Sequence, residues 1–199
     1  MARLLFHNEK HEYILEGEKL PSVSHILRFM SRDIYEEMNQ YNVDSAARRG
    51  SSVHEACEIL DKYKTVECDD EYVPYVQAYI KFLKEHSVEW EDIEKQYYHK
   101  TRLYAGTIDR FGIVGGAKAL VDIKTSCTVH KPLAKAQLNA YEDMRESQGL
   151  ETAEKLLCLQ LMKDGKYRLY EAAKDMSEFD ACWLLHTALS KKHKRGAIE

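Results

Sequence analysis

Apolar residues recur every three to four positions through several long segments, a spacing typical of helices with one buried face. The clearest case is the segment 45–64, where small and apolar residues fall on one side of a helix. Pro21 opens an earlier helix, with Ser22 or Ser24 as its N-cap. Further helices are predicted over 33–41, 72–87, 132–147 and 177–192.

A second pattern, rich in Ile, Val and Tyr and bounded by turn residues, predicts strands. Residues 4–7 and 12–15 form an N-terminal β-hairpin, and Gly115-Gly116 and Lys163-Asp-Gly-Lys166 are typical of tight turns. Further strands are predicted over 91–100, 103–114, 118–125, 155–163 and 166–172. Helices come first, and then a meander of strands interrupted by one helix. This order predicts an α/β or α+β fold in which helices pack on a mixed central sheet.

The Gly115-Gly116 turn fixes the register of the two strands that it joins. A two-residue turn pairs the residues on either side of it, and following that register places Asp109 opposite Asp122. Side chains of such a pair lie about 5 Å apart on one face of the sheet, and Lys124 lies on that face too. Because facing carboxylates repel unless a cation holds them, the pair predicts a metal-dependent hydrolytic site.

The chain has 199 residues, 44% hydrophobic and 31% charged, which is typical of a soluble globular protein. We expect one domain over 1–199, divided into an N-terminal hairpin and helices (1–42), a catalytic core (43–175), and a C-terminal helix with a basic tail (176–199). No apolar run approaches the roughly 20 residues of a membrane span, and no signal or transit peptide is recognisable. A cytoplasmic protein without a membrane partner is therefore expected.

The cysteines predict neither a disulfide scaffold nor a metal cluster. Their number is odd and none is in C-x-x-C spacing, which argues against a zinc ribbon or an iron–sulfur cluster. Reduced and mostly buried thiols are expected instead. The five are Cys57, Cys68, Cys127, Cys158 and Cys182.

Positive charge is concentrated around the two aspartates, although the whole chain carries a net charge of −4. The segment 95–135 contains eight Lys and Arg residues, and Asp109 and Asp122 are its only acids. Such a basic zone is expected of a protein that binds a phosphodiester backbone, although a solvated charged surface would look the same. The basic run 191–195 is weaker support, because terminal basic runs are often only soluble ends.

Asp109 and Asp122 supply the hard oxygen ligands that suit Mg²⁺ or Mn²⁺. The carbonyl of Ile123 is a candidate third oxygen. Lys124 can orient or deprotonate the attacking water, or neutralise charge that builds on a phosphate. An isolated D-x-K on a strand is more often a solvent-facing charge pair, so the interpretation depends on Asp109 and the basic surroundings.

Two helices carry further candidates. His54 lies within the 45–64 helix, with Glu58 one turn later as a candidate partner for its second ring nitrogen. Arg48 and Arg49 precede it and can meet phosphates. A single helical histidine is nevertheless more often a packing or capping residue.

Gln137 and Tyr141 lie one turn apart on the helix that follows Lys124. They present an amide and a phenol from one face, a pattern that ordinary amphipathic packing also produces. Thr125 and Ser126 directly follow the Lys124 strand, and either donate hydrogen bonds to a phosphate or merely end the strand.

Taken in order, these residues resemble the PD-(D/E)xK nuclease superfamily, and within it the RecB-type exonucleases. That branch has a helical His, a strand Asp, a (D/E)xK on the next strand, and Q-x-x-x-Y on a helix. The corresponding residues here are His54, Asp109, Asp122-Ile-Lys124 and Gln137-Leu-Asn-Ala-Tyr141. The segment Pro21-Ser-Val-Ser-His-Ile-Leu also looks like phage exonucleases and the mitochondrial genome-maintenance exonuclease. The resemblance covers about residues 12–141.

The resemblance implies a restriction-endonuclease-like core in which His54, Asp109, Asp122 and the Ile123 carbonyl bind Mg²⁺ or Mn²⁺. Lys124 would be catalytic, and Gln137 and Tyr141 would position it or the substrate. Asp122 departs from the Glu that many members carry. The cysteine cluster that some relatives use is missing, so no iron–sulfur cluster is expected.

The function implied is a metal-dependent deoxyribonuclease, an exonuclease that acts on single- or double-stranded DNA ends in recombination, repair or phage DNA processing. A recombinase or a single-strand-binding protein is a candidate partner. An endonuclease with the same core, a non-catalytic DNA-binding module and a purely structural domain remain as alternatives.

Overall fold

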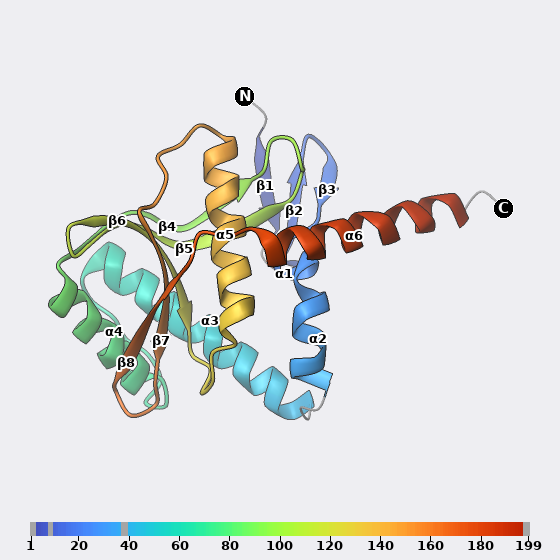
Figure 1. The fold of residues 1–199 in the computed structure, drawn as a ribbon. Coiled ribbons are helices and arrows are strands. Elements are labelled where there is room, and N and C mark those ends of the chain that lie inside the picture. The colour runs from blue at the N-terminus through green and yellow to red at the C-terminus, as the bar shows by residue number, and fades with distance from the viewer. Residues whose placement is uncertain (1–2, 8–9, 37–39, 197–199) are drawn as a thin grey trace.

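The computed structural model describes residues 3–7, 10–36 and 40–196, and only the backbone of 33–36, 40–42 and 191–196. Its centre is a five-stranded sheet in the order β4-β5-β6-β7-β8 (Figure 1). The strands are β4 (Val88–Tyr98), β5 (Ala105–Val114), β6 (Ala117–Lys124), β7 (Lys155–Leu161) and β8 (Tyr167–Ala172). Only β6 and β7 are parallel. The mixed sheet flanked by helices confirms the predicted fold class.

Helices cover both faces of this sheet. They are α1 (Val23–Ile26), α2 (Arg28–Glu36), α3 (Gln40–Tyr63), α4 (Val73–His86), α5 (Lys131–Ser147) and α6 (Ser177–Gly196). One core cluster joins α1, α5 and α6 to one face of the sheet, with Phe111 and Leu120 at its centre. A second joins α3 and α4 to the other face, with Val121 and Leu159 at its centre. The sheet is therefore the middle of three layers.

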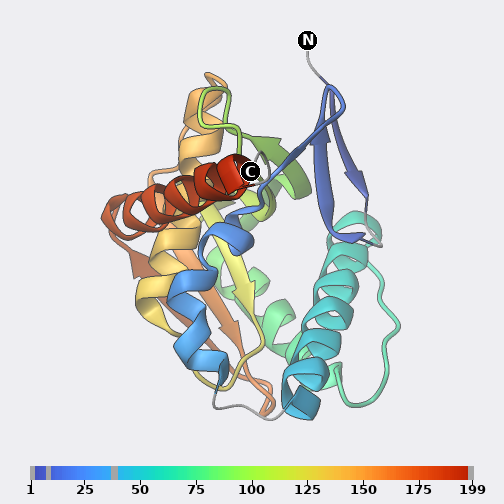
Figure 2. The ribbon, with the colours of Figure 1, turned by 90° about the vertical axis from the view of Figure 1, so that its right-hand side faces the viewer.

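The N-terminal segment adds a small sheet of its own. The predicted strands β1 (Leu4–His7) and β2 (Glu12–Leu15) pair as expected, and β3 (Glu18–Leu20) adds a third strand that was not predicted. It is too short and too polar to show a periodic pattern, and Glu16 and Gly17 turn into it with positive φ angles of 51° and 89°. Figure 2 shows this sheet beyond the C-terminal end of α3.

Other boundaries differ locally from the predictions. The expected helix over 33–41 is divided between the end of α2 and the start of α3, and residues 37–39 lie outside the described residues. Strand β4 begins at Val88 because Ser87, with φ of 47°, turns the chain directly out of α4. Ser22 caps α1, as predicted, by accepting a hydrogen bond from the amide of His25.

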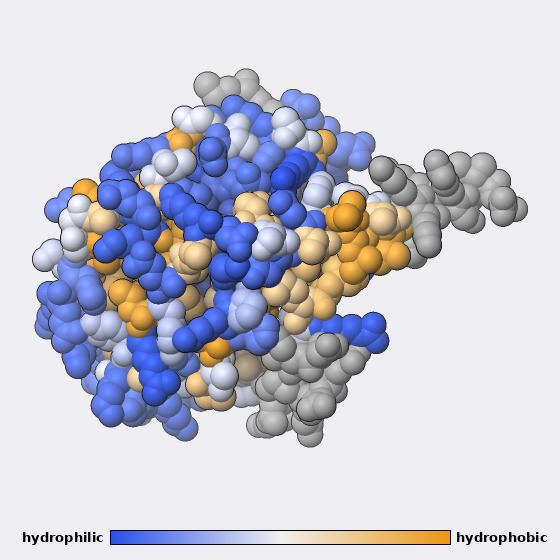
Figure 3. Space-filling view, in the orientation of Figure 1, coloured by the Kyte–Doolittle hydropathy of each residue, from blue (hydrophilic) through white to orange (hydrophobic). Residues whose placement is uncertain are grey.

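Helix α6 projects from the body, and apolar side chains gather where it leaves, with Leu184 71% exposed (Figure 3). Cys57, Cys158 and Cys182 are buried, as expected of most of the thiols. Among the described helices, none is long and apolar enough to span a membrane.

Gly112 provides a test of the register between β4 and β5. A Cβ atom there would lie 2.1 Å from the carbonyl oxygen of Glu89, next to the bulge between Trp90 and Asp92. We expect Gly112→Ala to lower the free energy of unfolding by about 3 kcal/mol in urea denaturation, because backbone must move. Gly50→Ala is the control. Its Cβ would meet only Thr125 Oγ1 at 3.9 Å, so this helical substitution should be neutral or stabilising by up to about 1 kcal/mol. Equal effects would contradict the register.

Candidate active site

Strands β5 and β6 stop pairing just before the two aspartates. Their register follows the predicted turn, and the last pair is Arg110 with Val121. One step further, the Asp109 carboxylate accepts a hydrogen bond from the backbone amide of Ile123 at 2.6 Å. Asp109 and Asp122 therefore do not form the regular cross-strand pair that the register predicted, because a side chain replaces the next ladder contact.

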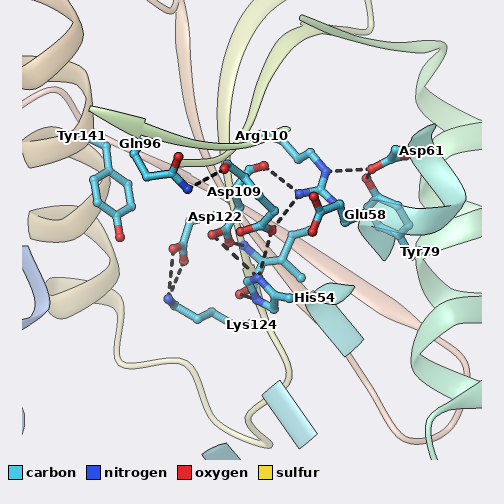
Figure 4. Close-up of polar contacts among 12 residues, drawn as sticks. His54, Glu58, Asp61, Tyr79, Gln96, Asp109, Arg110, Asp122, Lys124 and Tyr141 are labelled. Atoms are coloured by element: carbon cyan, nitrogen blue, oxygen red, sulfur yellow. Dashed lines mark hydrogen bonds and ion pairs between the residues drawn. The ribbon is translucent and has the colours of Figure 1, made fainter. Parts of the chain in front are cut away.

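The imidazole of His54 reaches this point from α3 (Figure 4). Its Nε2 lies 3.0 Å from the carbonyl oxygen of Ile123. Its Nδ1 lies 3.3 Å from the Glu94 carboxylate and 3.7 Å from that of Asp109. The structure thus brings together three of the four predicted ligands, His54, Asp109 and the Ile123 carbonyl.

Glu94 is a site residue that the sequence did not reveal. One ligand atom each from His54, Glu94 and Asp109 lie within 4.8 Å of one another, a group that can hold a metal ion. Glu94 also has a φ of 47°, which is strained for a residue with a side chain. Such strain is concentrated at functional sites. Nothing in the polar run 91–95 distinguishes Glu94 from its neighbours.

Glu58 does not support the imidazole as predicted. Its carboxylate pairs with Lys62, one turn further along α3, while His54 Nδ1 is bonded to Glu94. The i, i+4 spacing places Glu58 near the cavity wall, but the strand β4 supplies a carboxylate closer to the ring.

Asp122 and Lys124 form a second group beside the first. Lys124 Nζ lies 2.8 Å from Asp122 Oδ2 and donates to Gln137 Oε1 at 3.0 Å. Gln137 Nε2 in turn donates to the Tyr141 hydroxyl at 2.8 Å. The predicted pair on α5 is therefore in contact with the lysine. Asp122 is 1% exposed, and Lys124 Nζ also donates to its other oxygen, Oδ1, at 3.0 Å. The buried carboxylate is therefore paired with the lysine through both oxygens.

Burial and mutual attraction set the charges of these groups. Burial disfavours a charged His54, but Asp109 and Glu94 outweigh it and raise the pKa of His54 to about 9. Burial raises the pKa of Asp122 to about 6 against the attraction of Lys124, and it also raises the pKa of Asp109. Burial opposes the charge of Lys124 as well, yet Asp122 and Asp109 raise its pKa. The lysine is therefore held as a cation.

Arg110 fixes the position of Glu94 and of α3. Its side chain is fully buried, and its guanidinium donates to Asp61 of α3 at 2.7 Å, to Glu94 at 2.9 Å and to the carbonyl oxygen of Asp109 at 2.7 Å. Asp61 also accepts from the Tyr79 hydroxyl of α4 at 2.7 Å. One cation thus connects α3, α4, β4 and β5 around the candidate ligands.

The predicted basic zone is largely neutralised by carboxylates that are distant in sequence. Six of its eight cations form ion pairs: Lys95 with Asp92, Arg102 with Asp180, Arg110 with Asp61, Lys118 with Glu91, Lys124 with Asp122, and Lys135 with Asp175. Charge counted along the sequence therefore overestimated the positive field around the site.

The remaining predicted residues divide into two groups. Arg49, Thr125 and Ser126 line a cavity together with His54 and Lys124. The buried Nε of Arg49 has no hydrogen-bond partner, and its guanidinium lies 6.0 Å from the ring centroid of Tyr75. Arg48 is exposed and does not line this cavity.

The donor set fits a divalent cation. Two carboxylates and a backbone carbonyl suit Mg²⁺ and Mn²⁺, and an imidazole favours Mn²⁺ and other transition metals more than Mg²⁺. The attraction that raises the pKa of His54 shows that Asp109 and Glu94 create a position favourable to positive charge. A cation that replaces the imidazole proton would satisfy the same carboxylates.

Metal binding tests which glutamate belongs to the site. Mn²⁺ at a hundred times its Kd should stabilise the folded protein by about 2.7 kcal/mol, because only the folded chain gathers the ligands. We expect Glu94→Gln to abolish most of the shift in melting temperature, whereas Glu58→Gln keeps it. Calorimetric titration with Mn²⁺ measures the same difference directly. The opposite pattern would assign the ligand to Glu58.

Arg110→Gln should lower the free energy of unfolding by about 3–5 kcal/mol, because it leaves two carboxylates without their buried partner. Arg102→Gln is the control. It breaks an ion pair in which Arg102 is 33% exposed, which should cost at most about 1 kcal/mol. Urea denaturation compares the two, and similar losses would show that the Arg110 network is not a major source of stability.

The comparisons with known proteins give a similar shape and little more. No protein-family model matches the chain, and no curated protein does. Among solved structures, the crystal structure of an alkaline exonuclease (LHK-Exo) from Laribacter hongkongensis is similar at a TM-score of 0.45 and 16% identity, over 90% of this chain and 93% of that one. LHK-Exo in complex with dAMP matches over the same shares at a TM-score of 0.44 and 16% identity.

Proposed function

We propose that the chain is a divalent-metal-dependent nuclease that hydrolyses phosphodiester bonds at DNA ends. One observation carries the proposal: a carboxylate–imidazole group able to hold a cation lies beside a buried aspartate–lysine pair at the point where β5 and β6 part. These are the parts that metal-assisted hydrolysis requires, namely a position for a cation and a fixed positive charge next to it.

His54, Glu94, Asp109 and the Ile123 carbonyl are the residues that would hold the cation, and Asp122 lies beside them, paired with Lys124. When bound there, Mg²⁺ or Mn²⁺ supplies polarisation of the phosphoryl oxygen and lowers the pKa of a coordinated water.

The contacts of Lys124 define the role that we propose for it. Its ammonium is held between Asp122 and Gln137, and Tyr141 holds Gln137 in turn. A lysine fixed in this way can orient the attacking water and neutralise charge that develops on the phosphate. Arg49, Thr125 and Ser126 line the adjoining cavity and can contact the neighbouring phosphates.

The preference for DNA ends is supported by the resemblance of the ordered residues to RecB-type exonucleases. The same resemblance suggests work in recombination, repair or phage DNA processing, with a recombinase or single-strand-binding protein as a partner. An endonuclease with the same core would use the same residues. Activity on closed circular DNA, which has no ends, therefore distinguishes an endonuclease from an exonuclease.

Digestion of end-labelled linear DNA, single- and double-stranded, with Mg²⁺, Mn²⁺ or EDTA tests the proposal. We expect metal-dependent release of label, intact closed circular DNA, and a fall in kcat of about 10²–10³-fold for Lys124→Ala, since a fixed charge at the phosphate is lost. Asp122→Asn should be impaired in the same way.

Lys118→Ala is the matched control, because Lys118 lies on the same strand but pairs with Glu91 and Glu151. It should keep the activity of the wild type. Cleavage of circular DNA would favour the endonuclease. No cleavage of any DNA with either metal would favour a non-catalytic DNA-binding module.

A further inference from the structure

Two cavities meet at the candidate site. One, of about 740 Å³, extends from His54 to the N-terminal sheet. The other, of about 440 Å³, extends between α2 and the first half of α3. Both are lined by Ser24, Gly50, His54 and Gln137. They are therefore two lobes of one groove that follows α3, the helix that Figure 2 shows opposite α1 and α2.

The charged side chains that line the two lobes are of opposite sign. Among the described residues, the larger lobe is lined by no Lys or Arg, but by Glu55 and Glu58 in addition to the candidate ligands Glu94 and Asp109. The smaller lobe is lined by Arg49 and Lys124 and, within the same described part of the chain, by no Asp or Glu. Arg49 attracts a phosphodiester backbone to the smaller lobe, and Glu55 repels one from the outer wall of the larger lobe. A less charged part of the substrate has to occupy the larger lobe.

Aromatic rings form the far wall of that larger lobe. Phe6 and Tyr13 are cross-strand neighbours with ring centroids 4.7 Å apart, and His11 lies edge-on to Phe6 at 5.2 Å. Tyr13 is buried, with its hydroxyl 2.8 Å from Thr107 Oγ1, while Phe6 is half-buried and His11 is exposed.

We propose that Phe6 and His11, backed by Tyr13, form a binding site for an unstacked nucleobase. This inference rests on the proposed nuclease function, since the strand has to pass the candidate active site. A base has an uncharged π-face that stacks on aromatic rings largely without regard to sequence. A base inside a duplex is stacked on both of its faces and cannot present one to the rings, so the site selects an unstacked base of a single strand.

A cycle of substitutions in the protein and in the DNA tests this site. Binding of short oligothymidylates, each with one abasic position, is measured by fluorescence anisotropy with Ca²⁺ as the metal. For the wild type, one abasic position should weaken binding by about 5- to 100-fold, the range of one stacked base. In the variant Phe6→Leu/His11→Asn the same abasic position should have no further effect. Asn is chosen because His11 has a φ of 49°, which Asn tolerates.

Leu5→Ala is the matched control. Leu5 is 44% exposed and alternates with Phe6 along β1, so it points to the opposite side of the strand. This variant should retain the abasic effect, and thermal unfolding verifies that both variants fold. An equal abasic effect in the ring variant and the wild type, or no abasic effect in the wild type, would overturn the base site.

The cleavage assay separates failure of this inference from failure of the nuclease proposal. Metal-dependent cleavage, together with an equal abasic effect in the ring variant and the wild type, would overturn the base site and leave the nuclease proposal intact. An abasic effect that is present in the wild type and lost in the ring variant, without cleavage by the wild type under any metal, would support the base site and overturn the nuclease proposal. Failure of the wild type to bind any oligothymidylate would overturn the base site.

Discussion

The buried guanidinium of Arg110 is the interaction on which the arrangement of the site depends. It contacts a carboxylate from α3, a carboxylate from β4 and a backbone carbonyl of β5. The His54 helix and the Glu94 strand thereby share one cation, and neither can shift without leaving a charge unpaired in the interior. Asp61 lies two turns after His54 on α3, so its ion pair also fixes which face of the helix points to the sheet.

The parting of β5 and β6 is the second constraint. In a continued ladder the backbone amide of Ile123 would donate to a carbonyl oxygen of the neighbouring strand. Here it donates instead to the Asp109 carboxylate. This places Asp109 beside His54 and leaves Asp122 with Lys124. The two aspartates thus take different partners. One joins the group able to hold a cation, and the other holds the lysine in place.

The local elements could be predicted from sequence because hydrophobic period, caps and turn residues are local signals. The Gly115-Gly116 turn gave the register up to Arg110, and the order of His54, Asp109, Asp122 and Lys124 indicated which residues would meet. Contacts that depend on tertiary geometry could not be predicted. The position of Glu94 depends on its positive φ angle. The charge of the basic zone is neutralised by carboxylates that come from elements distant in sequence.

Cleavage of DNA that carries a phosphorothioate at the scissile position tests the central claim most directly. If a divalent cation held by this chain contacts the phosphate, sulfur should slow cleavage with Mg²⁺, a hard ion, and Mn²⁺, which tolerates sulfur better, should restore much of the rate. Equal slowing with both metals, for each phosphorothioate stereoisomer, would contradict a contact between the metal and the phosphate. It would require another role for the group formed by His54, Glu94 and Asp109.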